Sequence, residues 1–441
     1  MSPGGLPGLQ NRWRVVMRAA VGSTPIHSRL LFVFPLIMNL LETPEETQYS
    51  TENLVNIVKQ FMTIEQFTLG KTRDDHLIEF EGLLDMPSQQ AYEMAAETLN
   101  PHGLTPLFRF SGEKHKVILK KGLFQTKDQK IGVNLILFLI TFISIIFSGI
   151  ITTYTGPQTA DFSIIWSHVK INLGQSIAFA ISLLSILTAH EFGHYFAARI
   201  HKTKVTLPFF IPFPLSPFGT MGAFIRLLEP PKNKKVLLDI GLAGPIAGLV
   251  VAIPVLIYGL TLSTIDILPT VLPPDFTFEG NSILYLILKY LVHGAWLPEP
   301  ASFQGIHPSL YWIRYFFTGA PLPTGGIDVL IHPVAWAGWA GLLVTSLNLI
   351  PAGQLDGGHL IYSLFGDKLK WIRPGILVAL VILGFMWSGW WLWAFLILFL
   401  GRRRAEPLDE ITDLNPGRKI MARIGLIIFF LVFSPVPLII V

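Results

Sequence analysis

The 441-residue chain contains no cysteine and few charged residues. Without cysteine, disulfide bonds are excluded, and a metal site must be built from histidine, aspartate or glutamate side chains. Charged residues make up 14% of the chain, whereas a soluble globular protein usually contains about a quarter. Because 51% of the residues are hydrophobic and the mean hydropathy is +0.53, the composition predicts an integral membrane protein.

The chain also lacks a strong excess of charge of one sign. Its formal net charge is only +4, and no part of it resembles a nucleic-acid-binding surface, so no nucleic-acid partner is expected. Basic residues lie mostly beside apolar runs, where membrane proteins place their cytoplasmic anchors. The lipid bilayer is therefore the first partner that the sequence indicates.

Long apolar runs after residue 130 predict a mainly α-helical, polytopic transmembrane bundle, since a helix needs about 20 apolar residues to cross a bilayer. These runs are residues 131–160, 171–189, 240–265, 333–355, 374–401 and 424–441. The fifth run is long enough for one tilted helix or for two short helices that turn at Ser388 and Gly389. The basic clusters share one side of the membrane only if this run crosses twice, so of six or seven spans we prefer seven.

The remaining chain divides into an extension, a small domain and a loop. Residues 1–50 are expected to be disordered or to lie on a surface, and we hypothesise that translation starts at Met38. Residues 51–125 predict a small α+β cytoplasmic domain, with strands at 77–84, 104–110 and 116–119, a helix at 88–99 and no catalytic cluster. Residues 126–441 form the membrane domain, in which residues 263–332 are an outer loop with an amphipathic segment at 281–297.

A metal-binding motif follows directly on the second apolar run. His190, Glu191 and His194 form the pattern His-Glu-x-x-His. Residues four apart lie on one face of a helix, so both imidazoles can bind one zinc ion, and Glu191 can take a proton from a water beside it. Ionisable side chains in a bilayer are costly, and a bound dication compensates for that cost. The alternative, a pair of helix-surface histidines, leaves the cost unexplained.

Asp356 is the best candidate for a third ligand, because most other acidic residues lie outside the apolar runs. It follows the fourth run, after Pro351, and precedes Gly357 and Gly358. Proline and glycine break a helix, and irregular backbone is tolerated at membrane depth where it faces protein or a cavity. The alternative is an ordinary aspartate that caps a loop.

These motifs together resemble the site-2 protease family of intramembrane zinc metalloproteases, in its bacterial and plastid branch. The resemblance rests on residues 190–194, on Gly-Pro-Ile-Ala-Gly at 244–248, and on residues 348–357, in the order that the family shows. It implies that Asp356 is the third zinc ligand and that Glu191 is the general base. It also implies that Asn348 helps to hold the oxyanion or the substrate backbone.

The family also has a short membrane-associated β-segment, which residues 218–225 fit. An exposed strand edge can pair with an extended peptide, so we expect substrate binding at Gly219, Thr220, Met221, Gly222, Ala223 and Phe224; a simple loop is the alternative. Gly244 and Gly248 are expected to serve close helix packing. The predicted function is hydrolysis of peptide bonds within or near transmembrane segments of membrane-protein substrates, at a site toward the cytoplasm.

Two other functions fit a membrane protein with these residues. A non-proteolytic chaperone or scaffold of the same fold usually lacks the glutamate or a histidine of the motif, and this chain keeps both. A metal transporter spreads its ligands over several helices near the midplane, and the glutamate within the motif is surplus to metal passage. Metal content and cleavage of a model transmembrane substrate together distinguish the three functions.

Overall fold

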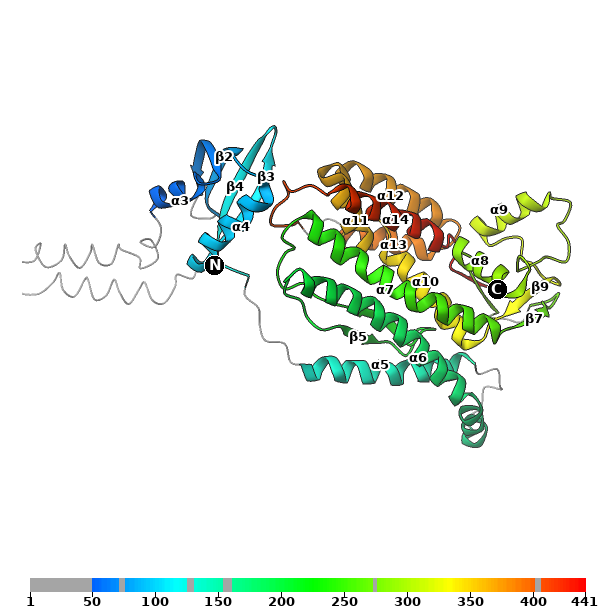
Figure 1. Ribbon diagram of the computed structural model, residues 1–441. Coiled ribbons are helices and arrows are strands. Elements are labelled where there is room, and N and C mark those ends of the chain that lie inside the picture. Colours follow the sequence, from blue (N-terminus) through cyan, green and yellow to red (C-terminus); the bar gives the residue numbers. More distant parts are fainter. Residues whose placement is uncertain (1–49, 71–75, 125–130, 154–160, 273–275, 401–405) are drawn as a thin grey trace, which may run out of the picture. The chain divides into compact units, whose positions relative to one another are not determined.

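Helices dominate the structure, a computed structural model, which describes residues 50–70, 76–124, 131–153, 161–272, 276–400 and 406–441 (Figure 1). The chain divides into two units between Ile64 and Glu65. Residues 1–49, including Met38, lie outside the described residues. In the first unit, helix α3 (Thr51–Val58) begins at Ser50, whose hydroxyl accepts a hydrogen bond from the Asn53 N–H at 3.2 Å. Sequence analysis missed this helix and the strand that follows it, β1 (Met62–Leu69).

The polar part of the second unit contains an antiparallel sheet. Strand β2 (His76–Leu84) pairs with β4 (Lys114–Lys121), which pairs with β3 (Leu104–Ser111), and the sheet order is β1-β2-β4-β3. Helix α4 (Ser88–Leu99) packs against β3, with the rings of Tyr92 and Phe108 in edge-to-face contact at 5.7 Å. A 3-10 turn at Asn100–His102 ends the helix. The predicted strands and helix of this segment are all present.

Residues 406–415, here called the strap, are held to β3. The Phe108 N–H donates to the Leu408 carbonyl at 2.8 Å, and the Glu410 N–H donates to the Phe108 carbonyl at 3.0 Å. On its other side the strap pairs with the chain just before the third apolar run, where the Asp409 N–H donates to the Lys232 carbonyl at 2.8 Å. The strap thus joins segments that are far apart in the sequence.

Among the described residues, three helices are long and apolar enough to cross a membrane: α5 (Ile131–Thr152), α6 (Phe162–Ile200) and α7 (Lys234–Thr261). Helix α6 packs against both α5 and α7. Pro245 and Pro254 lie inside α7 without ending it, as transmembrane helices allow because neighbouring groups satisfy the freed backbone. The prediction of a mainly α protein with membrane-type helices is confirmed at this level.

The later apolar runs form shorter helices. These are α10 (Pro333–Asn348), α11 (Asp356–Phe365), α12 (Leu369–Gly384), α13 (Gly389–Leu400) and α14 (Pro416–Val432), with a 3-10 turn at Gly366–Lys368 before α12. The fifth run is two helices, since α12 ends before Ser388 and α13 begins at Gly389. The last apolar run does not form one helix as expected. Helix α14 starts before the run, and the end of the run forms strand β10 (Leu438–Ile440).

The segment between α7 and α10 has structure of its own. Strands β7 (Thr264–Ile267) and β9 (Ile327–Leu330) pair with each other, and β8 (Thr277–Glu279) pairs with β10. In the sequence, helices α8 (Ile283–His293) and α9 (Pro308–Thr318) lie between β8 and β9, and α8 occupies the predicted amphipathic segment.

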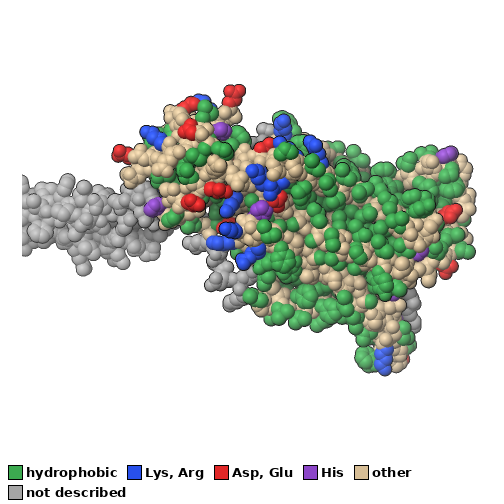
Figure 2. All heavy atoms as spheres, viewed as in Figure 1, with side chains coloured by type: hydrophobic (Ala, Val, Ile, Leu, Met, Phe, Trp, Pro, Cys, Tyr) green, Lys and Arg blue, Asp and Glu red, His purple; other side chains and the backbone are tan. Residues whose placement is uncertain are grey.

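The surface of the helical part is largely hydrophobic, as Figure 2 shows. On α5, for example, the side chains of Ile131, Leu135 and Ile143 are 66%, 58% and 66% exposed. A soluble protein rarely exposes a continuous apolar surface of this extent. Contact with lipid acyl chains accounts for it.

We predict that Asp409→Ala destabilises the second unit by about 3 kcal/mol. Asp409 is 1% exposed, and its carboxylate accepts hydrogen bonds from the Ser88 hydroxyl at 2.8 Å and from the N–H groups of Ile411 and Thr412. Each buried donor left without its acceptor costs about 1–3 kcal/mol. The measurement is the urea midpoint of protease resistance in detergent.

Asp413→Ala is the matched control, because the Asp413 side chain is in the same strap but 65% exposed. We expect it to change stability by less than about 0.5 kcal/mol. Equal midpoints for the two variants would contradict the prediction.

Candidate metal centre

Helix α6 carries two histidines that point the same way from a buried stretch. His190 and His194 are 3% and 6% exposed, and their Nε2 atoms are 3.2 Å apart. One turn of helix separates them, so the spacing of the motif alone brings both rings to one face. The motif lies near the end of α6, in the apolar part of the bundle.

The Asp356 carboxylate completes a triangle with these nitrogens. Its Oδ2 atom lies 3.4 Å from His190 Nε2 and 3.3 Å from His194 Nε2. Ligands at 2.0–2.1 Å from a tetrahedrally coordinated zinc ion are about 3.3 Å apart. All three separations are close to this value. The two histidines and the aspartate therefore form a donor set that can hold one metal ion.

The loop between α10 and α11 brings Asp356 to the histidines. Gly353 adopts a positive φ of 61°, which favours glycine. A Cβ on Gly357 would lie 2.0 Å from the Leu349 carbonyl oxygen, and one on Gly358 would lie 2.4 Å from that of Gly353. The loop therefore folds back against the first turn of α11 at a distance that only glycine permits. This confirms that irregular backbone precedes Asp356.

Glycines on α7 make room for the imidazole rings. A Cβ on Gly244 would lie 2.0 Å from His194 Nε2, and one on Gly248 would lie 3.2 Å from His190 Nδ1. Sequence analysis assigned these glycines to helix packing. In the structure the two histidine rings pack against α7 at these glycines. A side chain at position 244 would therefore clash with the candidate ligand His194.

A backbone carbonyl of α7 orients His194. His194 Nδ1 lies 2.7 Å from the Ile240 oxygen, so the ring donates its proton there. The Nε2 lone pair then faces Asp356 and His190. Metal-binding histidines usually have such a partner on the second nitrogen. Sequence analysis could not identify Ile240, because a carbonyl leaves no signature in the sequence.

Two further predicted residues border the triangle. Glu191 is 5% exposed, and the backbone N–H of Ile225 is within hydrogen-bonding reach of its carboxylate. The Asn348 amide nitrogen lies 3.2 Å from His190 Nε2. Both side chains thus lie next to the three ligand atoms without belonging to the triangle. The structure brings together all five polar residues that were predicted for the site.

The predicted β-segment is one strand of a hairpin. Strand β6 (Thr220–Phe224) pairs with β5 (Phe209–Pro212), and among the described residues this sheet has no third strand. Met221 and Phe224 are 68% and 48% exposed, whereas Gly219 precedes the strand with a φ of 69°. The prediction of a β-segment is therefore confirmed over the simple-loop alternative, and the segment ends beside Glu191 at Ile225.

Helix α5 holds this hairpin through polar side chains. The Asn134 amide donates to the Pro208 carbonyl at 2.8 Å. The hydroxyls of Ser144 and Ser148 donate to the carbonyls of Gly219 and Ser216, each at 2.6 Å. Sequence analysis missed these contacts. The available signal was polar residues recurring at helical spacing on one face of an otherwise apolar span.

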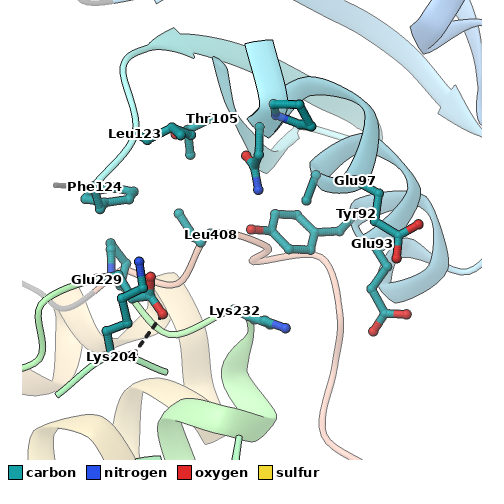
Figure 3. A pocket seen from close by; sticks show the side chains of 14 residues that line it. Tyr92, Glu93, Glu97, Thr105, Leu123, Phe124, Lys204, Glu229, Lys232 and Leu408 are labelled. Carbon is teal, nitrogen blue, oxygen red and sulfur yellow. Dashed lines mark hydrogen bonds between the residues drawn. The ribbon is translucent and has the colours of Figure 1, made fainter. Parts of the chain in front are cut away.

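A cavity of about 600 Å³ lies elsewhere in the second unit, and Figure 3 shows its lining. Tyr92, Glu93 and Glu97 enter from α4, opposite Lys232 and Glu229, and the Glu229 carboxylate accepts a hydrogen bond from the Lys204 N–H at 2.9 Å. None of the five polar residues around the metal centre lines this cavity. It is therefore separate from the candidate site.

The fold and the ligand triangle are those of a membrane-type protein that can hold a metal ion, with the motif on a helix long and apolar enough to cross a membrane. Residues 178–383 match the model of Peptidase family M50. This match confirms the resemblance to the site-2 protease family that the motifs indicated.

Curated relatives agree with the family match. The chain is 30% identical over 325 residues to "Probable zinc metalloprotease EGY1, chloroplastic" of Arabidopsis thaliana, covering 69% of this chain and 53% of that protein. It is 28% identical over 260 residues to "Probable zinc metalloprotease EGY2, chloroplastic" of Oryza sativa subsp. indica, covering 58% of this chain and 42% of that protein. The chain thus spans about half the length of these relatives. No solved structure matches. Zinc is the metal that the relatives' names and the donor set both indicate.

We predict that Gly244→Ala lowers zinc affinity by about 10–100-fold, the range seen when the surroundings of a metal ligand are disturbed. The added methyl group would occupy the position of the His194 ring. Gly174→Ala, on α6, is the matched control, because a methyl group there meets no heavy atom within 4 Å. Zinc content of the purified proteins, measured against chelator concentration, tests this. Normal zinc retention by Gly244→Ala would contradict it.

Proposed function

We propose that this protein is an intramembrane zinc metalloendopeptidase that hydrolyses peptide bonds within or near the transmembrane segments of other membrane proteins. The observation that carries the proposal is the triangle of His190, His194 and Asp356 with Glu191 beside it, inside an apolar helix bundle. Regulated intramembrane proteolysis is the process in which such an activity takes part.

His190, His194 and Asp356 would hold the zinc ion. When bound, zinc polarises a carbonyl group and makes a water molecule more acidic. Glu191 accepts a proton from the attacking water and delivers it to the leaving amine. The Asn348 amide, which borders His190, donates a hydrogen bond to the oxygen of the scissile carbonyl as negative charge develops there.

The substrate must be extended at the point of cleavage, because a helix keeps its carbonyls in internal hydrogen bonds. The free edge of β6 can pair with an extended segment by main-chain hydrogen bonds. We assign this role to Gly219, Thr220, Met221, Gly222, Ala223 and Phe224. Strand β6 ends at Phe224, and the next residue, Ile225, lies beside Glu191, so a paired substrate would lead to the catalytic groups.

For topology we propose a multi-pass protein of six or seven spans, with α12 and α13 as two of them. The small domain at residues 51–125 and the metal centre then face the cytoplasm, or the stroma if the protein resides in a plastid, as the names of the relatives suggest for them. Residues 126–441 are the protease domain, and residues 263–332 lie on the opposite side. A transmembrane protein substrate and the bilayer are its partners.

A membrane chaperone or a metal transporter would not need Glu191. The position of this carboxylate beside the ligand triangle is useful for moving a proton and adds nothing to simple scaffold function. We therefore favour proteolysis over both alternatives.

We predict that Glu191→Gln keeps zinc bound and lowers the cleavage rate by about 10²- to 10⁴-fold, the usual contribution of general acid–base catalysis. Glutamine has nearly the same shape but cannot accept the proton. The measurement is cleavage of a co-expressed model transmembrane substrate, with zinc content determined in parallel. Asp356→Ala serves as the comparison, because it should lose both zinc and activity. Full activity of Glu191→Gln would refute the assignment.

We also predict that Ser144→Ala combined with Ser148→Ala reduces cleavage and leaves zinc content unchanged. These hydroxyls fix the hairpin to α5 and do not touch the ligands. A loosened β6 edge orders the substrate less well, so KM should rise more than kcat falls. Ser185→Ala on α6 is the control, because its hydroxyl bonds only within its own helix, to the Ile181 carbonyl. An unchanged KM in the double variant would contradict the role of the hairpin.

A further inference from the structure

A second cavity, of about 410 Å³, lies between α5, α6 and the end of the hairpin. Thr152 and Thr153 line it from α5 and the residue after it, Ser176 from α6, and Pro217 from the hairpin turn. Trp336 of α10 and Glu279 of β8 close it. None of these residues takes part in the mechanism above. We call it the α5–α6 cavity.

The polar atoms in the α5–α6 cavity are mainly hydrogen-bond acceptors. The hydroxyls of Thr152 and Thr153 donate to the carbonyls of Ser148 and Gly149, each at 3.0 Å, so their oxygens offer lone pairs to a ligand. The Ser176 hydroxyl is 2% exposed and has no hydrogen-bond partner among the described residues. A buried hydroxyl without a partner is costly, and a ligand in the cavity would satisfy it.

A carboxylate adds negative charge to this cavity. Glu279 is 9% exposed and accepts a hydrogen bond from the Tyr285 hydroxyl at 2.8 Å. Behind it lie a second buried carboxylate, Asp328, and one buried ammonium, Lys289, whose Nζ is 4.0 Å from Asp328 Oδ1 and 4.6 Å from the Tyr285 ring centroid. Two carboxylates thus share one cation, so Lys289 can balance only one of them when both are ionised.

Burial and the neighbouring Asp328 raise the pKa of Glu279 to about 7, although Lys289 acts in the opposite direction. A cation in the cavity would favour the ionised form of this carboxylate. An ammonium or guanidinium group brings several donors and a positive charge, which are what an acceptor-rich, acidic cavity lacks.

The hairpin connects this cavity to the metal centre. The chain from Pro217 to Ile225, which contains strand β6, runs from the hairpin turn to a position beside Glu191. Ser176 precedes His190 by fourteen residues of α6, or about 21 Å of helix. An extended chain covers this distance in about six residues at 3.3 Å each, and the eight steps along the chain from Pro217 to Ile225 give a similar reach. A substrate paired with β6 would therefore arrive at the cavity.

We propose that the α5–α6 cavity binds the side chain of a substrate lysine or arginine located about six to eight residues from the scissile bond. Glu279 supplies the counter-charge, and Ser176, Thr152 and Thr153 accept hydrogen bonds from the cationic group. The inference rests on the proposed proteolytic function and names a specificity determinant for it. Binding in this cavity would make the protease selective for substrates with a basic residue at the end of the extended segment.

The test is a set of model substrates with a single lysine moved through positions four to ten on either side of the cleavage site, against an alanine-only substrate. We expect wild type to cleave one or two adjacent lysine positions on the order of tenfold faster than alanine, as a charged hydrogen bond in a buried site allows. Glu279→Gln should remove this preference and cleave the alanine substrate at the wild-type rate.

Glu299→Gln is the matched control, since Glu299 is an exposed acid of the same loop and should keep the preference. Equal rates for all lysine positions in wild type, or a preference that survives in Glu279→Gln, would overturn the inference while leaving proteolysis intact. If Glu279→Gln also failed to cleave the alanine substrate, Glu279 would have a structural role, and this result would overturn the inference as well. Failure of wild type to cut any substrate would count against the proposed function itself.

Cross-linking tests the cavity independently of cleavage. The chain has no cysteine, so Thr152→Cys in a Glu191→Gln background provides a single thiol. A substrate with cysteine six to eight residues from the cleavage site should form a disulfide with it. Ile181→Cys, on the exposed side of α6 at 54% exposure, should not react. Equal reaction at both positions, or none at Thr152→Cys, would reject the proposed location.

Discussion

The need to bring two imidazoles and a carboxylate within about 3.3 Å of one another inside an apolar bundle determines much of this structure. Side chains of that size on α6 cannot approach α7 unless the facing helix is almost bare, and Gly244 and Gly248 provide that surface. The aspartate cannot come from a regular helix at that point, so the chain breaks after α10 and restarts at Asp356 itself. Two helices and one loop are thus shaped by a single set of contacts.

Burial explains why the polar groups around the centre are so closely matched. In a medium of low polarity an unpaired charge is expensive, and here Asp356 and Glu191 lie beside two imidazoles. A divalent cation held at this site would balance both carboxylates. The Ile240 carbonyl fixes the His194 tautomer, which leaves the lone pair that such an ion requires. Stability of the bundle and capacity to bind metal therefore depend on the same hydrogen bonds.

The sequence was informative where the chemistry is local or has a fixed spacing. Two histidines four residues apart predicted the shared helix face, and a lone aspartate between helix-breaking residues predicted the third vertex. The strands and helix of the polar domain followed from alternation and capping residues. Long-range partners were not accessible in this way: nothing near Ile240 marks its carbonyl as a partner, and the pairing of the strap with β3 and with Lys232 joins three distant segments. The last apolar run was misjudged because hydropathy does not distinguish the end of α14 from the strand β10.

The hairpin shows how a membrane protein can keep an open strand edge. Unpaired backbone groups in lipid cost several kcal/mol each, so an edge survives only where protein shields it or where a partner arrives. Asn134, Ser144 and Ser148 tie β5 and its turn to α5, and a Cβ on Gly219 would lie 2.4 Å from the Ile145 Cα, so α5 shields one side closely. The exposed strand is left on the other side, beside Glu191. The energetic cost of that open edge would favour pairing with an extended segment, as we propose for the substrate, since no other described strand of the chain pairs with β6 there.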